Sequence, residues 1–493
     1  MNSSLCKFIA LFVALAFMPG RSLTAAENGD KARLNVIFIL IDDMGWMDTG
    51  CYGSKFYETP NIDKLASQGM LFTNAYAACP VCSPTRASIL SGKYPARLNL
   101  TDWLPGQKDD PDHKLCHPTI IDHLPLEEIT IPKVLKTGGY VSAAIGKWHL
   151  GGPEYYPDKN GFDLNRGGSE QGHPPTYFSP YHLKTLENGP IGEYLTDRLT
   201  SEAEQFIEKN RETPFFLYLS HYAVHNPQEA KKELIEKYKK KPKPKGASTP
   251  ERENARRVQD RPIYAAMVHS ADESVGRIVA KLEELKLSDR TIVIFTSDNG
   301  GLSTAEGSPT SNEPLRAGKG FLFEGGIREP LIVKWPGVVK EGSICDETVC
   351  SVDFYPTILD MAGLKPQPQQ TLDGVSIVPL LKQSGVLTRD ALFWHYPHYS
   401  NQGGKPGGAI RKGDFKLIEF YEDSHVELYN LKEDISEMKN LAGKMPEKTT
   451  ELKKLLADWR VSVGAQMPTP NPDYKKKKSA LNPKVQAGMD ASD

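Results

Sequence analysis

Apolar residues in this chain gather in short, nearly continuous runs rather than in alternating patterns. Residues 34–41 (LNVIFILI) and 291–297 (TIVIFTS) are the clearest of these runs and are rich in β-branched side chains. Such runs are typical of strands that are buried on both faces of a parallel sheet. Similar runs predict further strands at residues 140–145, 214–220 and 330–333. We therefore expect a central sheet with two covered faces.

Segments with helical periodicity alternate with these strands. The predicted helices span residues 61–68, 130–136, 192–209 and 262–285. Thr130 is expected to act as an N-cap, because it stands just ahead of Pro132 in the first turn of its helix. Strands that alternate with helices indicate an α/β fold, in which helices sandwich a large, mixed, mostly parallel sheet.

The pattern changes after residue 362. Residues 363–379 are rich in Pro, Gln and Gly, and four short apolar segments with turn residues between them follow, at residues 392–395, 409–412, 415–420 and 426–429. These segments predict a small antiparallel sheet, and residues 448–461 predict a helix after it. The expected organisation is a large α/β domain at 27–384, a small C-terminal α+β subdomain at 385–465 and a polar, lysine-containing tail at 466–493.

Residues 1–26 are typical of a signal peptide. A weakly positive start precedes the apolar residues 8–18 (FIALFVALAFM), and Ala25-Ala26 supplies a small-residue cleavage site. The apolar run holds about a dozen residues, which is too short to span a bilayer; a buried N-terminal helix is the alternative. No other stretch approaches transmembrane length. We expect an exported protein, periplasmic or extracellular, without a membrane span.

Composition narrows the functional classes further. The 493 residues include 60 basic and 62 acidic ones, and the formal charge of −2 argues against a nucleic-acid partner, since nucleic-acid-binding domains are normally basic. With 39% hydrophobic and 25% charged residues, the chain has a globular composition. Cys6 belongs to the predicted leader, and the six remaining cysteines are too sparse for a disulfide scaffold. Their pairing cannot be assigned from the sequence.

Acidic residues follow both of the clearest strand runs. Asp42-Asp43 ends the first run and Asp298-Asn299 ends the second. Ligands of open α/β sheets bind outside the carboxyl ends of the strands, where both pairs are expected to lie. Clustered carboxylates repel one another unless a divalent cation binds them, and oxygen ligands favour Ca²⁺ or Mg²⁺ over zinc. The alternative is that each pair caps the N-terminus of a helix.

A cysteine motif lies at residues 79–93 (CPVCSPTRASILSGK). Cys79 and Cys82 have the spacing of a redox pair or of half a zinc site, but no second CxxC completes a zinc site. A cysteine at the start of a helix can also be a thiolate nucleophile with a lowered pKa. The residues alone leave these alternatives open.

The same segment resembles the signature of the type I sulfatases of the alkaline phosphatase superfamily. The resemblance rests on Cys82, Pro84 and Arg86, followed by Leu90 and by Gly92-Lys93. It implies that Cys82 is oxidised to formylglycine by a formylglycine-generating enzyme, and that the hydrated aldehyde is the nucleophile. A Cys79–Cys82 disulfide would block this maturation.

Further segments of the chain resemble landmarks of the family, and they occur in the family's order. In addition to Asp42-Asp43, they are GKWHLG at 146–151, HYAVH at 221–225, SDNG at 297–300, Lys319 with EGGIREP at 324–330, and ELYNL at 427–431. The resemblance therefore covers the chain from about residue 34 to about residue 441.

The resemblance implies a role for each of these residues. Those implied to bind one calcium ion are Asp42, Asp43, Asp298, Asn299 and the side chain at position 82. Those implied to surround the sulfate are Arg86, Lys147, His149, His225 and Lys319. Asp298 is the implied base for the attack, and His149 takes up a proton from position 82 in a later step. Either Lys319 or His225 protonates the leaving oxygen.

The function implied is hydrolysis of sulfate monoesters on a sulfated saccharide. The alternatives are a phosphodiesterase or phosphonate monoester hydrolase of the same superfamily, and a non-catalytic protein that binds sulfated glycans. Specificity is expected to come from loops at 99–107, 172–181 and 395–398. Within them Trp103 either stacks on a sugar or packs at the edge of the core.

Overall fold

The computed structural model describes residues 33–246 and 250–475. The predicted signal peptide at 1–26 lies outside the described residues, and so does the tail beyond residue 475. From Leu34 on, the described chain belongs to one compact unit. The boundary predicted near residue 385 stays a prediction.

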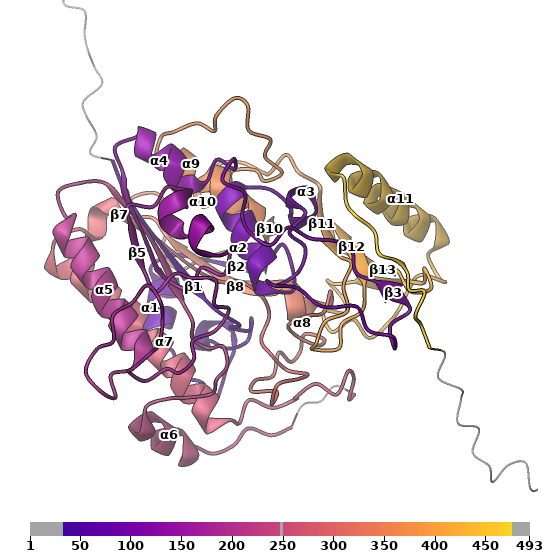
Figure 1. The fold of residues 1–493 in the computed structure, drawn as a ribbon, viewed down its shortest axis with the longest axis horizontal. Helices are drawn as coiled ribbons and strands as arrows, with labels where there is room; N and C mark the ends of the chain where they lie inside the picture. The colour runs from indigo at the N-terminus through magenta and orange to yellow at the C-terminus, as the bar shows by residue number, and fades with distance from the viewer. Residues whose placement is uncertain (1–32, 247–249, 476–493) are drawn as a thin grey trace, which may run out of the picture. The chain divides into compact units, whose positions relative to one another are not determined.

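A nine-stranded sheet dominates the described part of the chain (Figure 1). Its strands, in order across the sheet, are β10 (Val349–Cys350), β2 (Met70–Tyr76), β8 (Arg328–Lys334), β7 (Thr291–Ser297), β1 (Asn35–Ile41), β6 (Phe215–His221), β4 (Val141–Gly146) and β5 (Leu164–Arg166), with β9 (Ser343–Cys345) also paired to β2. All pairs are parallel except those that β8 makes with β2 and β7. The predicted mixed, mostly parallel sheet is confirmed.

Strand β1 lies at the centre of this sheet and is buried along its whole length. Its side chains alternate between two hydrophobic clusters, with Ile37 and Ile39 on one face and Phe38 and Leu40 on the other. Burial on both faces explains why the sequence shows a continuous apolar run here. The register pairs Ile41 with the last residues of both β6 and β7. The loops that leave these three strands therefore begin at one edge of the sheet.

Helices cover both faces, as Figure 1 shows. The helices that pack on the face of Ile37 are α1 (Pro60–Ser67), α5 (Leu195–Lys209) and α7 (Pro262–Glu284). Those that pack on the face of Phe38 are α2 (Cys82–Ser91), α4 (Ile131–Thr137), α9 (Phe354–Met361) and α10 (Val378–Leu381). The predicted α/β sandwich is confirmed. Within the described residues, no helix combines the length and the apolar character needed to cross a bilayer.

Shorter helical segments complete the connections. They are α3 (Pro95–Leu98), α6 (Lys232–Lys239), α8 (Glu324–Ile327) and the 3-10 turns η1 (Gly50–Tyr52), η2 (Pro153–Tyr155), η3 (Pro157–Asn160), η4 (Ser288–Arg290) and η5 (Ser351–Asp353). One local prediction was right about the position of the N-cap residue but not about its hydrogen bond. Thr130 occupies the N-cap position of α4, but its hydroxyl donates to the carbonyl of Asn160 at 2.6 Å instead of capping the helix. A tertiary hydrogen bond replaces the local one.

A separate four-stranded antiparallel sheet follows, as predicted. Its strands are β11 (Ala391–Tyr396), β12 (Gly407–Lys412), β13 (Phe415–Phe420) and β14 (Val426–Asn430). Helix α11 (Pro446–Val463) packs Leu452 and Leu456 against Ile410 and Leu417 of this sheet. Beyond it, β15 (Thr469–Pro470) pairs with β3 (Leu115–Cys116).

A buried ion cluster joins the small sheet to the segment that leads into β8. Lys416 of β13 lies 2.9 Å from Glu324 at the start of α8 and 3.0 Å from Glu437, and all three side chains are fully buried. Glu437 also accepts the backbone N–H of Glu324 at 2.7 Å. One ammonium therefore lies between two carboxylates that water does not reach, and Arg328, 3.2 Å from Glu324, supplies a second positive charge.

Replacing Lys416 by Met is predicted to lower the free energy of unfolding by about 3–5 kcal/mol, because two buried carboxylates lose their shared cation. Urea unfolding followed by tryptophan fluorescence measures the change. Lys454→Met is the control, since Lys454 forms an exposed pair with Asp458 whose loss costs less than about 1 kcal/mol. Equal stabilities for the two variants would show that the cluster contributes little.

Candidate active site

The residues predicted to carry chemistry converge at the carboxyl ends of the central strands. Asp42-Asp43 follows β1, Asp298-Asn299 follows β7, and the segment 147–149 follows β4. His225 lies four residues beyond β6, and Lys319 lies in the loop before α8. Cys82 is the first residue of α2, a helix buried along its length. The free backbone N–H groups of the first turn give the N-terminal end of α2, where Cys82 lies, a partial positive charge.

Three buried carboxylates are each paired with a buried cation. The Nζ of Lys147 lies 2.7 Å from Asp42 Oδ2, and the Nζ of Lys319 lies 2.7 Å from Asp43 Oδ1. Arg86 Nη2 lies 2.7 Å from Asp298 Oδ2, and its Nε donates to the same oxygen at 2.8 Å. These cations are the ones that the resemblance places around a sulfate. The three carboxylates and the three cations thus form one buried cluster of charges.

Burial and the neighbouring charges move several pKa values. Burial raises the pKa of Asp42 well above its usual value, and the attraction of Lys147 only partly offsets this. Burial alone would also raise the pKa of Asp43, but Lys319 and His225 together hold it below its usual value. The pKa of Lys319 is raised despite burial, because Asp43 stabilises the ammonium. Lys319 therefore keeps its proton in this environment.

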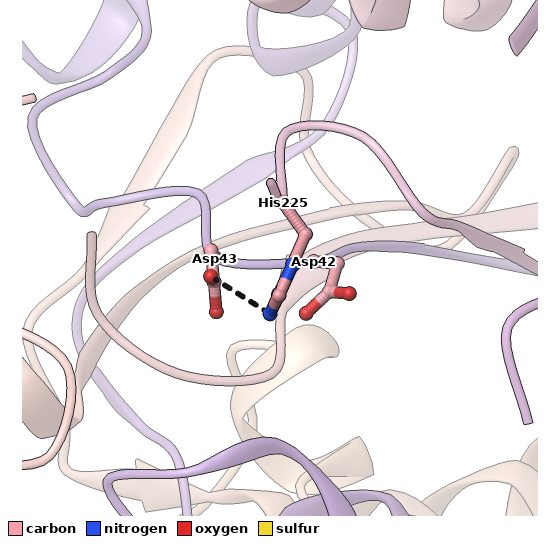
Figure 2. A group of neighbouring side chains, drawn as sticks. All are labelled: Asp42, Asp43 and His225. Atoms are coloured by element: carbon pink, nitrogen blue, oxygen red, sulfur yellow. Dashed lines mark ion pairs between the residues drawn. The ribbon is translucent and has the colours of Figure 1, made fainter. Parts of the chain in front are cut away.

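The oxygen atoms of this cluster fit a divalent cation. Single ligand atoms from Asp42, Asp43 and His225 lie within 4.8 Å of one another, and Figure 2 shows the His225 ring reaching toward the carboxylates. Asp42 Oδ1 and Asn299 Oδ1 are buried without a hydrogen-bond partner. Unpartnered buried oxygens are costly unless an ion or donor reaches them, and oxygen ligands suit calcium or magnesium.

The capping interpretation of the two acidic pairs is wrong. No helix in the described chain starts at either pair: the next helical segments begin at Gly50 and Glu324. The sequence did not predict that His225 would lie beside Asp43, where its Nε2 is 3.6 Å from Oδ2. Asp298, by contrast, uses Oδ2 for Arg86 and accepts the Asp43 N–H on Oδ1 at 3.2 Å.

His149 faces the side chain at position 82. Its Nδ1 lies 3.3 Å from Cys82 Sγ, and its Nε2 lies 2.6 Å from the Leu104 carbonyl oxygen. A carbonyl only accepts, so Nε2 carries the proton and Nδ1 of the neutral ring is free to accept one. Burial and the charge of Lys147 hold the pKa of His149 well below its usual value. The ring is therefore a base directed at position 82.

The space around His149 is closely fitted. A Cβ at Gly172 would stand 2.6 Å from His149 Cε1, so only glycine leaves room for the ring in this position. Cys79 and Cys82 are both free, and Cys79 Sγ points at the carbonyl of Thr101 at 3.8 Å. The CxxC spacing therefore forms no disulfide in this structure.

A cavity of about 340 Å³ opens in front of position 82. The residues that line it are Cys82, Trp103, Leu104, Pro105, His149, Glu170, Gly172, His173, His225, Glu306, Lys319, Asn401 and Gln402. Two of the predicted specificity loops, 99–107 and 172–181, contribute to its wall. The third, 395–398, does not: His395 and His398 are buried, and His398 bonds to Thr101 at 2.8 Å.

Four lining residues were missed in the sequence: Glu170, Glu306, Asn401 and Gln402. Each lies in a polar loop segment with no periodicity or motif of its own. Their positions depend on how distant loops meet, which local sequence does not encode. The closeness of 401–402 to the predicted segment 395–398 was the one available signal.

Comparison with known proteins agrees with this geometry. The profile of the Sulfatase family matches residues 34–364, and a second profile, N-sulphoglucosamine sulphohydrolase, C-terminal, matches residues 317–462. The first match runs from β1 to just beyond α9 and includes every residue predicted to bind calcium or sulfate.

Individual relatives extend the match. The chain is 35% identical to the N-acetylgalactosamine-6-sulfatase of Homo sapiens over 384 residues, which is 73% of this chain and 68% of that protein. It is 33% identical to a sulfatase of Formosa agariphila over 525 residues, covering 91% and 92% of the two proteins. The crystal structure of Ps i-CgsB in complex with k-i-k-neocarrahexaose superposes with a TM-score of 0.73 at 29% identity, covering 93% of this chain and 98% of that one. This chain belongs to the sulfatase family and is a sulfuric ester hydrolase.

Proposed function

We propose that this sulfatase hydrolyses sulfate monoesters of sulfated glycans, with a formylglycine made from Cys82 as the nucleophile and calcium bound at the buried carboxylates. The observation that carries the proposal is the position of Cys82. Its side chain lines a 340 Å³ cavity, faces His149 Nδ1 at 3.3 Å, and shares the cavity wall with His225 and Lys319.

The names of the relatives support a carbohydrate substrate. N-acetylgalactosamine-6-sulfatase is named for a sulfated amino sugar, and the Ps i-CgsB structure contains k-i-k-neocarrahexaose. The cavity volume of about 340 Å³ lies in the range of pockets that hold small-molecule ligands. Export, proposed from the signal-like residues 1–26, would bring the enzyme to sulfated polymers outside the cell.

Two groups that the twenty standard side chains do not supply would complete the site: a formylglycine and a calcium ion. A hydrated formylglycine supplies a hydroxyl on a carbon that can later regenerate an aldehyde, and calcium supplies Lewis acidity for that hydroxyl and the sulfate oxygens. The residues proposed to hold the ion are Asp42, Asp43, Asp298, Asn299 and the side chain at position 82. Asp298 is the proposed base for attack, and Arg86 orients its carboxylate at 2.7 Å.

The remaining residues are proposed to stabilise negative charge and to transfer protons. Lys147 and Lys319 carry positive charge beside the position where sulfate oxygens would lie, and such fixed charges stabilise negative charge that develops during reaction. His149 accepts a proton from position 82 on Nδ1, since Leu104 holds its other nitrogen. Lys319 and His225 both line the cavity, and we propose that one of them protonates the leaving oxygen.

Sulfate release from a panel of defined sulfated saccharides tests the proposal. The enzyme, matured with a formylglycine-generating enzyme, is expected to release sulfate from at least one sugar and to hydrolyse matched phosphate esters far more slowly. Cys82→Ala is expected to lower the rate by at least about 10³-fold, because the nucleophile is lost. Preferred turnover of phosphate or phosphonate esters would assign the enzyme to the other branch of the superfamily.

Calcium retention provides a second test. Asp298→Asn keeps the shape of the side chain but removes one negative charge from the cluster. We expect the purified variant to lose calcium on dialysis, measured by elemental mass spectrometry, and its kcat to fall by about 10²–10³-fold. Asp289→Asn is the matched control, since Asp289 is exposed at the other end of β7. Full calcium content and full activity in Asp298→Asn would refute the assignment.

A further inference from the structure

The outer part of the cavity carries polar groups that sulfate chemistry does not use. Gln402, from the loop between β11 and β12, is only 5% exposed, yet its Oε1 has no hydrogen-bond partner. Its Nε2 donates to Glu306 Oε1 at 2.7 Å, which fixes the orientation of the amide. Both residues line the cavity. The buried amide of Gln402 therefore positions Glu306 on the cavity wall.

Glu306 is held by neutral amides. Asn401 donates to its Oε1 at 2.9 Å, and Asn226 lies 3.3 Å from its Oε2. Among the described residues, no Lys, Arg or His side chain forms an ion pair with this carboxylate. Its negative charge is therefore fixed in place but not neutralised, and it remains a strong acceptor for hydroxyl groups.

The charge of the cavity wall changes from its floor to its rim. Of the described residues that line it, Lys319 is the one lysine, no arginine is present, and Lys319 is paired with Asp43 on the floor. The acidic lining residues are Glu170, which pairs with Lys184, and Glu306. The rim thus offers acceptors to hydroxyls and, among the described lining residues, no lysine or arginine for a second anionic group. Trp103, Leu104 and Pro105 add apolar surface to the same wall.

We propose that Glu306, Asn401 and Gln402 form a subsite that binds the hydroxyl groups of the sulfated sugar. The Glu306 carboxylate accepts hydroxyl protons, while Asn401 and Gln402 hold the carboxylate in place. The subsite selects sugars without a second sulfate or a carboxylate next to the ester that is cleaved, because such a group would face Glu306 without a counter-charge. This inference rests on the proposed function and adds the class of sugar.

Steady-state kinetics with paired substrates tests the subsite. The ratio of kcat/KM for a monosulfated sugar to kcat/KM for 4-nitrocatechol sulfate, which has no sugar ring, is the readout. Glu306→Ala is expected to lower this ratio at least tenfold. Glu306→Gln, which removes the charge but keeps the size, is expected to raise the rate on a disulfated sugar at least fivefold relative to the monosulfated one. Glu341→Ala, at an exposed remote site, is the control.

The outcomes separate the two proposals. An active wild-type enzyme whose substrate ratios do not change in either Glu306 variant would overturn the subsite alone. Equal losses on sugar and aryl sulfates would also overturn it, since they would indicate a general effect on the site. A wild-type enzyme that hydrolyses the aryl sulfate but no sugar sulfate would overturn the glycan substrate itself.

Discussion

Three carboxylates buried at the ends of two adjacent strands impose the constraint on which the site depends. Asp42, Asp43 and Asp298 are at most 1% exposed, and charges removed from water must be paired or neutralised. Lys147, Lys319 and Arg86 provide that pairing. We propose that the same cations stabilise a sulfate ester beside position 82. In this proposal, one cluster provides both the anionic ligands for a metal and the cations for an anion.

The cavity divides into two chemical environments above this cluster. Its floor holds Cys82, His149, His225 and Lys319, which are proposed to bind and cleave one sulfate group. Its rim holds apolar side chains together with acceptors that favour hydroxyl groups. The acceptors of the rim come from the loop after β7 and from the loop between β11 and β12, and the Lys416 cluster ties the small sheet to the segment before β8. In this proposal, substrate selection depends on how the loop between β11 and β12 packs against the loop after β7.

Much of the fold could be predicted because strands that are buried on both faces have continuous apolar runs in the sequence. The continuous runs at β1 and β7 predicted both the strands and the edge where Asp42 and Asp298 meet. The antiparallel insertion of β8 between β2 and β7 was not visible, since an apolar strand has the same pattern in either direction. The approach of His225 to Asp43, and the meeting of Glu306 with Gln402, depend on loops whose paths tertiary contacts determine. Thr130 illustrates the same limit, because a partner thirty residues away decided its hydrogen bond.

The proposed conversion of Cys82 to formylglycine is the step on which the proposed roles of the carboxylates, the cations and the cavity all depend. Tandem mass spectrometry of the peptide that contains residue 82, taken from active enzyme coexpressed with a formylglycine-generating enzyme, examines it most directly. We predict an aldehyde in place of the thiol, in a fraction of molecules that rises in step with specific activity. Fully active protein in which residue 82 is an unmodified cysteine, or is bonded to Cys79, would contradict this account of the site.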